Sequence, residues 1–512
     1  MTFLQLLDGV EVLAESGDPA VSGLEYDSRR VKPGIAFVAM RGETSDGNRY
    51  IDQAIQSGAV AIVTDSASEK PRPGVGWAVV PNGRRALARL SANFYKRPAE
   101  RMAITGITGT NGKSTTAFLI ESIFSAAGRK SALIGTIEYH VAGRVYPAPH
   151  TTPEALELAR FLNEALGNGA SEAVMEVSSH ALAQQRVFGV PFDVAVFTNL
   201  TRDHLDYHKT MEEYFAAKRA LFEGVGTDPP RAAVTNLDDE YGAKLVEFSR
   251  KRGSFVLTYG WQRGDFHCEN AEISPRGTRF ELITPEDKLA VFSPLIGRVN
   301  VYNILAAAAA CYGRKCEAKA ILRGIESLTH VPGRFERVDC GQPFTVVVDY
   351  AHTDDALRNL TALAREFVAR GGENARVITL FGCGGDRDRA KRPLMGEAAG
   401  RGSDFVVLTS DNPRSEDPPA IINDAVVGLQ RAGTKYTVEA DRRKAIALAI
   451  REARPGDIVL LAGKGHEKVQ VTRQGSLPFD DVEVTRAELQ AAGYECQAAT
   501  GAEPGMAAGT RG

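Results

Sequence analysis

The chemically most informative segment of the chain is ITGITGTNGKSTT, residues 104–116, which runs from an apolar stretch through glycines into a helical pattern. Glycines permit positive φ, so successive backbone N–H groups can point at phosphate oxygens, and the N-terminus of the following helix adds its positive dipole end. Lys113 is placed for the β- and γ-phosphates and the Ser114 hydroxyl for Mg²⁺. Ile107 stands where the strict motif has its first glycine, yet Gly-Lys-Ser-Thr between a strand and a helix favours nucleotide binding over a structural turn. The predicted nucleotide contacts are Gly109, Thr110, Asn111, Gly112, Lys113, Ser114 and Thr115.

Two further side chains are candidates for holding a metal beside this loop. Glu176 in EVSSHAL and His204 in NLTRDHLDYH each follow an apolar stretch. Both stretches are expected in the sheet that begins at the phosphate loop, so both side chains can face the phosphates. A lone Glu or His at such a position is more often an ordinary loop residue, but the two together with a phosphate loop favour metal ligation. Because Mg²⁺ prefers oxygen ligands, the histidine indicates a second, less usual site.

Polar clusters close four apolar stretches in the last third of the chain. These clusters are residues 349–352, 382–387, 410–414 and 463–467. In an open parallel sheet the carboxyl ends of the strands meet at one edge, where ligands bind. Arg387 and Arg414 suit carboxylates, Asn412 suits a polar group and Glu467 suits an ammonium group, so this edge suits a zwitterion. For the stretch TSDNPRSEDPP alone, a polar turn with a solvated arginine is the alternative.

The elements that must position these residues follow an alternation of strand and helix patterns. This alternation predicts an α/β fold with parallel sheet covered on both faces. At 512 residues the chain is too long for one core, and about three domains are expected. We expect a small α/β domain over 1–100, a central domain with the phosphate loop and a mononucleotide-binding parallel sheet over 101–330, and a Rossmann-like domain over 331–496. Short alternating strands are expected at 266–294, a buried Ala-rich helix at 300–312, and a disordered tail at 497–512.

Charge and composition exclude several classes of protein. A net charge of −3 gives no basic excess for nucleic acid or an anionic membrane, and no 18-residue apolar run predicts a membrane span. The start of the chain has no positive region or cleavage site, so we expect no export and a cytoplasmic location. The six cysteines show no metal-ligand spacing and predict reduced thiols that fill the core.

The form GTNGKST resembles the phosphate loop of the Mur ligases and of their relative folylpolyglutamate synthase, and the resemblance extends over about residues 24–484. A Ras-like protein would need a guanine-reading Asn-Lys-x-Asp motif, which does not follow at the right place. The resemblance implies an enzyme dependent on ATP and Mg²⁺, which we expect to be a monomer. It assigns metal ligation to Ser114, Glu176, His204 and Lys218, and catalysis to Lys113, Lys218 and His204.

Lys218 lies in EEYFAAKRALF, an amphipathic helical pattern in which a lysine is ordinarily solvated. The resemblance implies instead that this lysine is carbamylated, which turns a cation into an anion near the metals. The residue pattern alone does not predict that modification.

The resemblance also implies a UDP-muramyl peptide as substrate. Residues 24–51 resemble the UDP-binding domain of the family, with Ser28 at the UDP, although a polar turn is the alternative for Asp-Ser-Arg alone. Residues 150–153 and the stretch VSSHALAQQR match positions that hold the peptide portion, with a helix cap and a surface amide as alternatives for Ser178 and Gln184. The implied contacts are Ser28, Thr151, Thr152, Ser178, Gln184 and Arg186.

Other matched positions concern the ATP. Asn303 is implied to contact the adenine, while Asn300 is a candidate N-cap of the Ala-rich helix. The family's ATP-facing residues of the third domain correspond to Arg334, Asp349 and His352. Asp354 stands where the family usually has proline, which leaves the shape of this loop open.

In the tripeptide-forming Mur ligases the third amino acid binds at the strand ends of the last domain, and Asp-Asn-Pro-Arg resembles the form that accepts meso-2,6-diaminopimelate. The implied contacts are Arg387, Asp411, Asn412, Pro413, Arg414, Gly463 and Glu467. The implied reaction is ATP-dependent amide formation on the D-Glu γ-carboxylate of UDP-N-acetylmuramoyl-L-Ala-D-Glu, through an acyl phosphate, in peptidoglycan synthesis. The rivals are a lysine-adding ligase, folylpolyglutamate synthase and a non-catalytic nucleotide-binding module.

Overall fold

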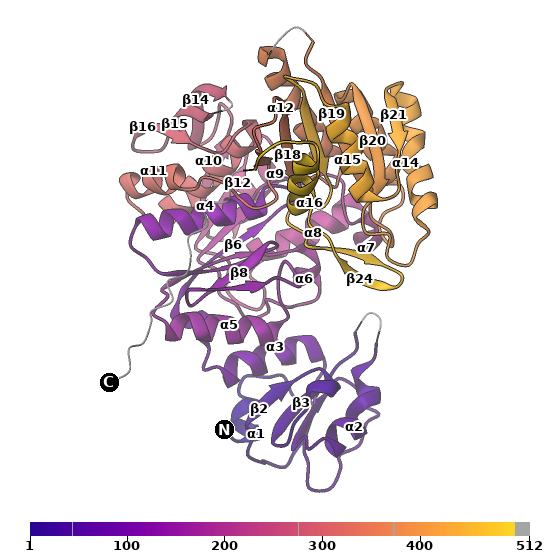
Figure 1. Cartoon of the computed structure of the whole chain (residues 1–512). Helices are drawn as coiled ribbons and strands as arrows, with labels where there is room; N and C mark the ends of the chain where they lie inside the picture. The colour runs from indigo at the N-terminus through magenta and orange to yellow at the C-terminus, as the bar shows by residue number, and fades with distance from the viewer. Residues whose placement is uncertain (43–44, 275, 372–373, 497–512) are drawn as a thin grey trace, which may run out of the picture. The chain divides into compact units, whose positions relative to one another are not determined.

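A computed structural model describes residues 1–42, 45–274, 276–371 and 374–496, and the tail expected to be disordered lies outside the described residues. The chain divides into two compact units, Met1–Val331 and the part from Pro332 onward (Figure 1). The fold is α/β in both units, as the sequence predicts. In the described part of the chain, no helix has the length and apolarity that crossing a bilayer requires.

The first unit begins with a five-stranded sheet in the order β1-β5-β4-β3-β2. Strands β2 to β5 are parallel and β1 pairs antiparallel with β5. Its strands are β1 (Ala14–Ser16), β2 (Gly23–Glu25), β3 (Ile35–Ala39), β4 (Ala61–Thr64) and β5 (Gly76–Val79). One face packs on α1 (Phe3–Leu6) and α3 (Gly83–Phe94), and the other on α2 (Ile51–Gln56).

The second sheet of this unit has eleven strands in the order β16-β15-β14-β13-β12-β11-β6-β10-β7-β8-β9. Its centre, from β7 to β14, is parallel, and its middle strands β6, β10, β11 and β12 are almost entirely buried, as is usual for parallel strands covered on both faces. The predicted antiparallel addition is present as β14, β15 and β16, but the hairpin β8–β9 at the other edge was not predicted. The strands are β6 (Ala103–Thr108), β7 (Ser131–Ile134), β8 (Glu138–Val141), β9 (Arg144–Pro147), β10 (Glu172–Glu176), β11 (Val194–Phe197), β12 (Ala232–Asn236), β13 (Phe255–Gly260), β14 (Phe266–Ser274), β15 (Gly277–Ile283) and β16 (Lys288–Ser293).

Helices cover both faces of the eleven-stranded sheet. One core contains α4 (Lys113–Ala126), α10 (Arg298–Gly313) and α11 (Ala318–Ser327). The other contains α5 (Ala155–Gly167), α6 (Ser179–Ala183), α8 (Met211–Glu223) and α9 (Glu240–Lys251), and the short α7 (Leu205–His208) lies beside α8. The predicted Ala-rich helix is α10, and its residues 304–311 are fully buried.

A charged bridge ties the unpredicted hairpin to the helix that follows the phosphate loop. His140 on β8 bonds through Nδ1 to Glu121 of α4 at 2.8 Å and through Nε2 to Glu138 at 2.9 Å. Burial alone would lower the pKa of His140, but the hydrogen bonds with the two carboxylates outweigh it and raise the pKa to about 9. The imidazolium is therefore the form that the folded protein stabilises near neutral pH.

This bridge predicts a pH-dependent contribution to stability. Because the pKa of His140 rises on folding, its contribution is full below the unfolded pKa of about 6.5 and is lost as the pH rises through about 9, with an upper limit of about 3 kcal/mol. The difference in free energy of unfolding between the wild type and His140→Gln should therefore shrink between pH 6 and pH 10. Denaturant titrations at several pH values measure it, with His330→Gln, at an exposed histidine, as the control. A difference that stays constant over this range would contradict the prediction.

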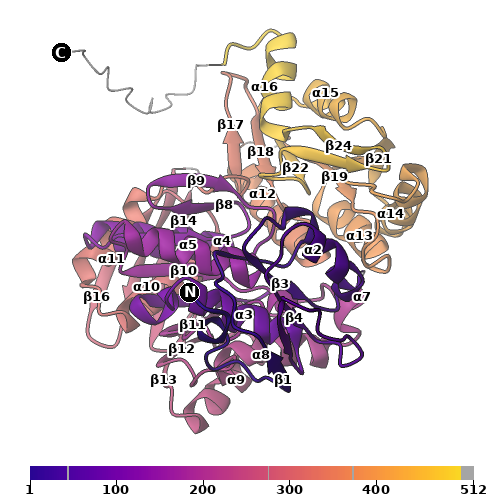
Figure 2. The ribbon, with the colours of Figure 1, turned by 90° about the horizontal axis from the view of Figure 1, so that it is seen from below.

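The second unit contains a six-stranded sheet in the order β17-β18-β22-β19-β20-β21. The four strands predicted from the sequence are β18, β19, β20 and β22, and they are mutually parallel neighbours. Helices α12, α13 and α14 lie on one side of the sheet and α15 and α16 on the other (Figure 2). The strands are β17 (Glu336–Val338), β18 (Thr345–Asp349), β19 (Val377–Cys383), β20 (Phe405–Ser410), β21 (Lys435–Val438) and β22 (Ile458–Ala462), with a separate hairpin of β23 (Val469–Thr472) and β24 (Gly475–Pro478). The helices are α12 (Asp354–Gly371), α13 (Lys391–Gly402), α14 (Pro418–Ala432), α15 (Arg442–Glu452) and α16 (Asp481–Ala491).

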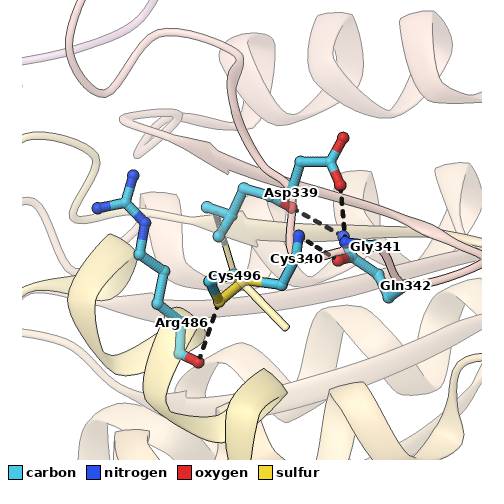
Figure 3. The surroundings of a disulfide bond; sticks show 7 residues. Asp339, Cys340, Gly341, Gln342, Arg486 and Cys496 are labelled. Atoms are coloured by element: carbon cyan, nitrogen blue, oxygen red, sulfur yellow. Dashed lines mark hydrogen bonds between the residues drawn. A yellow bond between two sulfur atoms is a disulfide. The ribbon is translucent and has the colours of Figure 1, made fainter. Parts of the chain in front are cut away.

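One pair of cysteines departs from the prediction of reduced thiols. Cys340, which follows β17, forms a disulfide with Cys496, at the end of the described chain (Figure 3). The Cys340 amide is held by Gln342 and the Cys496 sulfur lies 3.7 Å from the Arg486 carbonyl. The prediction of reduced thiols was wrong for this pair. The two cysteines are 156 positions apart in the sequence, so their spacing gives no local signal of a disulfide. The other four, Cys268, Cys311, Cys316 and Cys383, are free and buried, as predicted.

Candidate functional site

The phosphate loop connects β6 to α4 through two glycines in conformations that other residues rarely adopt. Gly109 has φ 146° and Gly112 has φ 88°. A Cβ at Gly109 would lie only 1.9 Å from the Thr198 Oγ1, so the close approach of the backbone requires glycine. Helix α4 begins at Lys113 without a side-chain cap, which leaves the positive end of its dipole for an anion. The loop therefore fits the polyphosphate of a nucleotide.

The loop is held in place by the segment that follows β11. The Thr110 amide donates to the Asn199 carbonyl at 2.8 Å and the Asn111 amide to the Asn199 Oδ1 at 2.9 Å. Thr198 Oγ1 donates to the Asn111 carbonyl at 2.7 Å. Sequence reasoning did not identify Thr198 and Asn199 as supports of the loop, although Asn199 is the first residue of the stretch NLTRDHLDYH that carries His204 and Thr198 directly precedes it.

Two lysines converge on the loop backbone. Lys113 Nζ donates to the carbonyls of Gly109 and Thr110 at 3.0 and 2.8 Å, and Lys218 Nζ donates to the same Gly109 carbonyl at 2.7 Å. Lys218 is only 2% exposed, so the alternative of an ordinary solvated helix lysine is excluded. Burial, and secondly the charge of Lys113, lower the pKa of Lys218 well below its usual range. Its ring neighbour is Tyr214, whose centroid lies 4.6 Å from Nζ.

Glu176 ends β10 with a buried carboxylate fixed in position. Thr136 donates to it twice, from its amide at 2.8 Å and from Oγ1 at 2.9 Å. A Cβ at Gly135 would lie 2.6 Å from the Glu176 Oε1, so glycine permits this approach. Thr136 was not predicted as a site residue.

His204 caps α7 with a left-handed backbone, φ 54°, a strained conformation typical of functional sites. Its Nε2 lies 3.5 Å from the Asp203 carboxylate, and its side chain is 39% exposed. The His180 ring lies 4.9 Å away.

The predicted metal ligands do not form a protein-only metal cage. Over the described ranges, no three His, Cys, Asp or Glu side chains gather closely enough to hold an ion. This fits Mg²⁺, which usually takes one or two protein oxygens and completes its shell with waters and substrate phosphates. Ser114 at the start of α4 and Glu176 offer such oxygens.

The residues matched to the UDP-muramyl peptide meet at the ends of β10 and α5. Ser178 caps α6 by accepting from the Ala181 amide at 3.1 Å, and its own amide donates to the Thr152 Oγ1 at 3.0 Å. Arg186 donates to the Gln184 Oε1 at 2.6 Å and to the Thr152 carbonyl at 2.9 Å. The cap expected as the alternative for Ser178 is therefore present, whereas Gln184 is a partner of Arg186 rather than an isolated surface amide.

Two other members of that set lie at its margin. Thr151 Oγ1 accepts from Thr136 Oγ1 at 3.1 Å, and Thr136 is the residue that holds the Glu176 carboxylate. Ser28 opens a short 3-10 helix, Ser28–Arg30. Arg30 lies 3.5 Å from Glu157 of α5, but no hydrogen bond among the described residues joins the Ser28 side chain to Thr152 or Arg186.

Asn303 lies against the phosphate loop. A Cβ at Gly112 would lie 2.4 Å from the Asn303 Oδ1, and Asn303 Nδ2 donates to the Asn300 Oδ1 at 3.0 Å. The expected N-cap role of Asn300 is wrong, because α10 starts two residues earlier, at Arg298 after Gly297. Asn300 instead orients the amide of Asn303.

In the second unit, the segment that carries Arg334 is bonded to Asp349 at the end of β18. Asp349 accepts from the amides of Phe335 at 2.7 Å and Ala351 at 2.8 Å, and Arg334 stacks over the Tyr350 ring at 4.7 Å. Burial raises the pKa of Asp349, with Arg334 opposing the shift.

The strand β18 continues into a turn whose shape the sequence left open. His352 Nδ1 lies 2.9 Å from the Tyr350 carbonyl. Asp354 is the first residue of α12 and pairs with Arg358 at 2.7 Å. Proline is favoured at this position because its φ suits the first turn of a helix, and an acid is favoured there because it complements the helix dipole. The departure from the family pattern therefore leaves the start of α12 well formed.

The predicted strand-end cluster is assembled in the second unit, because β18, β22, β19 and β20 are parallel neighbours. Asp411 and Asn412 are 7% and 5% exposed, so a merely solvated turn after β20 is excluded. Asn412 Nδ2 donates to the Glu467 Oε2 at 2.7 Å. A Cβ at Gly463 would lie 3.9 Å from the Asp411 carboxylate, so the backbone after β22 lies close to Asp411. The cluster consists of Arg387, Asp411, Asn412, Pro413, Arg414, Gly463 and Glu467.

The side chains of two arginines of this cluster lie beside Gly384. A Cβ at Gly384 would lie 3.0 Å from the Arg414 Nη1 and 3.8 Å from the Arg387 Cγ. Arg414 donates to the Gly385 carbonyl at 2.7 Å, and Arg387 to the Asp386 carbonyl at 3.1 Å. Burial, and secondly the charge of Arg387, lower the pKa of Arg414. Within the described residues neither guanidinium pairs with a carboxylate, so the arrangement favours an anionic ligand.

Sequence reasoning did not identify two buried cations behind this cluster. Arg392, 1% exposed, pairs with Glu416 at 2.7 Å, and Glu416 accepts from the Asp386 amide at 2.6 Å. Lys464 is fully buried beside Asp411. Lys464 lies inside the predicted 463–467 cluster, but nothing in the sequence separates it from a solvated loop lysine.

The phosphate loop on a parallel sheet is the arrangement of a nucleotide-binding α/β protein, and arginines and acids gather at the strand ends of a second α/β unit. Family models match three stretches of the chain: the Mur ligase family catalytic domain at 20–95, the Mur ligase middle domain at 107–311 and the Mur ligase glutamate ligase domain at 333–465.

Named relatives match almost the whole chain. A protein of Solibacter usitatus (strain Ellin6076) named UDP-N-acetylmuramoyl-L-alanyl-D-glutamate–2,6-diaminopimelate ligase is 54% identical over 94% of this chain and 96% of its own length. A protein of Geobacillus thermodenitrificans (strain NG80-2) with the same name is 45% identical over 96% and 99%. A solved structure with that name is 33% identical, with a TM-score of 0.66 over 96% of this chain and 99% of its own. The chain belongs to the Mur ligase family.

Proposed function

We propose that this protein is an ATP-dependent ligase that joins meso-2,6-diaminopimelate to the D-Glu γ-carboxylate of UDP-N-acetylmuramoyl-L-Ala-D-Glu. The observation that carries the choice of amino acid is the pair Arg387 and Arg414, which lies near Glu467 without a carboxylate partner of its own among the described residues. Diaminopimelate has a second carboxylate and ammonium at its far end, whereas lysine has only the ammonium. The names of the 54% and 45% identical relatives support the same choice.

The first half of the reaction is assigned to the phosphate loop. The γ-carboxylate of the substrate attacks the ATP γ-phosphate, which gives an acyl phosphate and ADP. Lys113, released from the loop carbonyls that it contacts at 2.8 and 3.0 Å, is the cation for the β- and γ-phosphates. Asn303, against Gly112, is assigned to the adenine side of the nucleotide, and Arg334 and Asp349 to its contacts in the second unit.

The second half is acyl transfer to the amine. The amino group of diaminopimelate attacks the acyl phosphate, and the tetrahedral intermediate collapses to the amide and inorganic phosphate. The cluster Thr151, Thr152, Ser178, Gln184 and Arg186, with Ser28, is assigned to the UDP-muramyl dipeptide. We propose that the enzyme works in the cytoplasm as a monomer.

The metal assignment rests on the oxygens near the loop. Ser114, Glu176, His204 and a carbamate on Lys218 would hold Mg²⁺, which when bound supplies positive charge to the phosphoryl group in transfer. Carbamylation fits Lys218 because burial, and secondly the charge of Lys113, lower the pKa of its buried ammonium group, which favours the neutral amine that reacts with CO₂.

The test is an assay of phosphate release with ATP and the UDP-dipeptide, in which meso-2,6-diaminopimelate and L-lysine are compared side by side. We expect diaminopimelate to be preferred by a factor of about 10² or more in kcat/KM, because lysine lacks the far carboxylate and leaves the half-buried Arg414 without the anion that it would pair with. A preference for lysine would overturn the choice of amino acid. Absence of ligation with both would overturn the assigned reaction.

A further inference from the structure

A fully buried ammonium lies behind the strand-end cluster. Lys464 follows β22, and its Nζ lies 3.1 Å from the Asn412 Oδ1, 3.2 Å from the Glu467 Oε2 and 3.5 Å from the Asp411 Oδ1. The side chain of Lys464 is 0% exposed, whereas that of Glu467 is 27% exposed. Solvent or a ligand can therefore reach Glu467, but Lys464 is shielded behind it.

Lys464 determines which way the Asn412 amide faces. The Asn412 Oδ1 accepts from Lys464 Nζ and from the Val471 amide at 2.9 Å. Both partners are donors only, so the amide cannot be flipped without placing NH₂ against two donors. The Asn412 Nδ2 is thereby fixed toward the Glu467 Oε2, at 2.7 Å.

The same ammonium sets the charge balance of the cluster. Lys464 lies between the two acids of the cluster, Asp411 and Glu467, and Arg414 is a second cation that interacts with both. Both hydrogen bonds to the Glu467 carboxylate seen among the described residues end on Oε2. Because the Glu467 side chain is 27% exposed, its carboxylate can also accept from an ammonium group of a ligand.

We infer that Lys464 is a positioning residue for the amino-acid substrate: it does not touch the substrate, but it fixes Asn412 and Glu467 in the geometry that receives the substrate ammonium. The inference rests on the proposed function, because it takes the strand-end cluster as the diaminopimelate site. Without Lys464, the Asn412 Oδ1 keeps only the Val471 amide as a donor, and Asp411 and Glu467 lose the ammonium group that lies between them.

The hairpin β23–β24 is tied to the same cluster. Val471 of β23 donates to Asn412, and the Arg414 amide donates to the Val471 carbonyl at 3.0 Å. Gln470 donates to the Asp411 carbonyl at 2.6 Å. These bonds fix the backbone of residues 411–414 independently of Lys464, so its loss should disturb side-chain orientation more than the loop itself.

The experiment compares Lys464→Met with the control Lys468→Met, at an exposed lysine four residues later that pairs with Asp480. In the full enzyme, Lys464→Met should raise the KM for diaminopimelate at least about tenfold, since hydrogen bonds to charged groups are involved. The KM values for ATP and for the UDP-dipeptide should stay within about twofold, as should all three in the control.

The outcomes separate the inference from the proposed function. A wild type that does not ligate diaminopimelate overturns the proposed function. A wild type that does, with an unchanged diaminopimelate KM in Lys464→Met or an equal rise in all three KM values, overturns only the role of Lys464. If thermal melting shows that Lys464→Met does not fold, Lys464→Gln replaces it; glutamine can still donate to Asn412 but lacks the charge, and an unchanged diaminopimelate KM there also overturns the inference.

Discussion

Replacement of Lys218 by alanine is expected to reduce the ligation rate by about 10³-fold, because it removes a charged group from the reacting centre. Lys218 Nζ lies 2.7 Å from the Gly109 carbonyl, inside the phosphate loop, and the side chain is 2% exposed. As a carbamate it would contribute anionic oxygens for the metal that neutralises the phosphoryl group. The initial rate of phosphate release, with both substrates and ATP saturating, measures the loss.

Chemical rescue separates this role from a structural one. In Lys218→Ala the truncated side chain leaves space in which a short-chain carboxylic acid can supply the missing oxygens. We expect added acetate or propionate to restore part of the rate in this variant and to leave the control Lys244→Ala, at an exposed lysine of α9, unchanged. Full activity of Lys218→Ala without rescue would refute the carbamate. Loss of activity together with a large fall in melting temperature and no rescue would assign Lys218 to the core.

The burial of Lys218 shows which features of a site a sequence can reveal. The lysine lies on an amphipathic pattern, and its helix α8 forms as expected, but the pattern does not say which side of the helix meets the phosphate loop. That depends on contacts between residues about 100 positions apart, such as Lys218 with Gly109. The phosphate loop itself was predictable because glycines, Lys113 and Ser114 act within one short segment whose conformation is local.

The strand-end cluster was predictable for a different reason. Parallel strands must end at one edge, so the four polar stretches after β18, β19, β20 and β22 had to meet, whatever their order. Burial of one member was not predictable: Lys464 and Glu467 are three residues apart, yet only Lys464 is sealed from solvent. The hairpin β8–β9 and the Cys340–Cys496 pair were missed because short edge strands and distant cysteines have no periodic signal.

Replacement of Arg414 by alanine should lower kcat/KM for diaminopimelate by about 10²-fold or more, because truncating one partner of a buried charge pair costs 2–5 kcal/mol. The Arg414 backbone is left-handed, with φ 51°, and its amide bonds to Val471, so the guanidinium is held in place rather than mobile. Burial and the nearby Arg387 make the unliganded state electrostatically unfavourable, which a substrate carboxylate would relieve. Steady-state kinetics with each substrate varied in turn measure the effect.

The selectivity of the Arg414→Ala effect is what identifies a carboxylate clamp. In the proposed reaction ATP contacts the phosphate loop, Arg334 and Asp349 but not Arg414, so the KM for ATP should change by less than about twofold. L-Lysine lacks the far carboxylate, so kcat/KM for lysine should be the same in Arg414→Ala as in the wild type. The preference for diaminopimelate over lysine should therefore shrink by about the same factor of 10². The kcat/KM of Arg414→Lys for diaminopimelate should lie between those of Arg414→Ala and the wild type, because lysine keeps the charge but not the two parallel hydrogen bonds.

The matched control is Arg389→Ala, at an exposed arginine that pairs with Asp424. Equal losses for ATP and diaminopimelate in Arg414→Ala, or an unchanged preference over lysine, would mean that Arg414 supports the fold of the turn and does not read the second carboxylate.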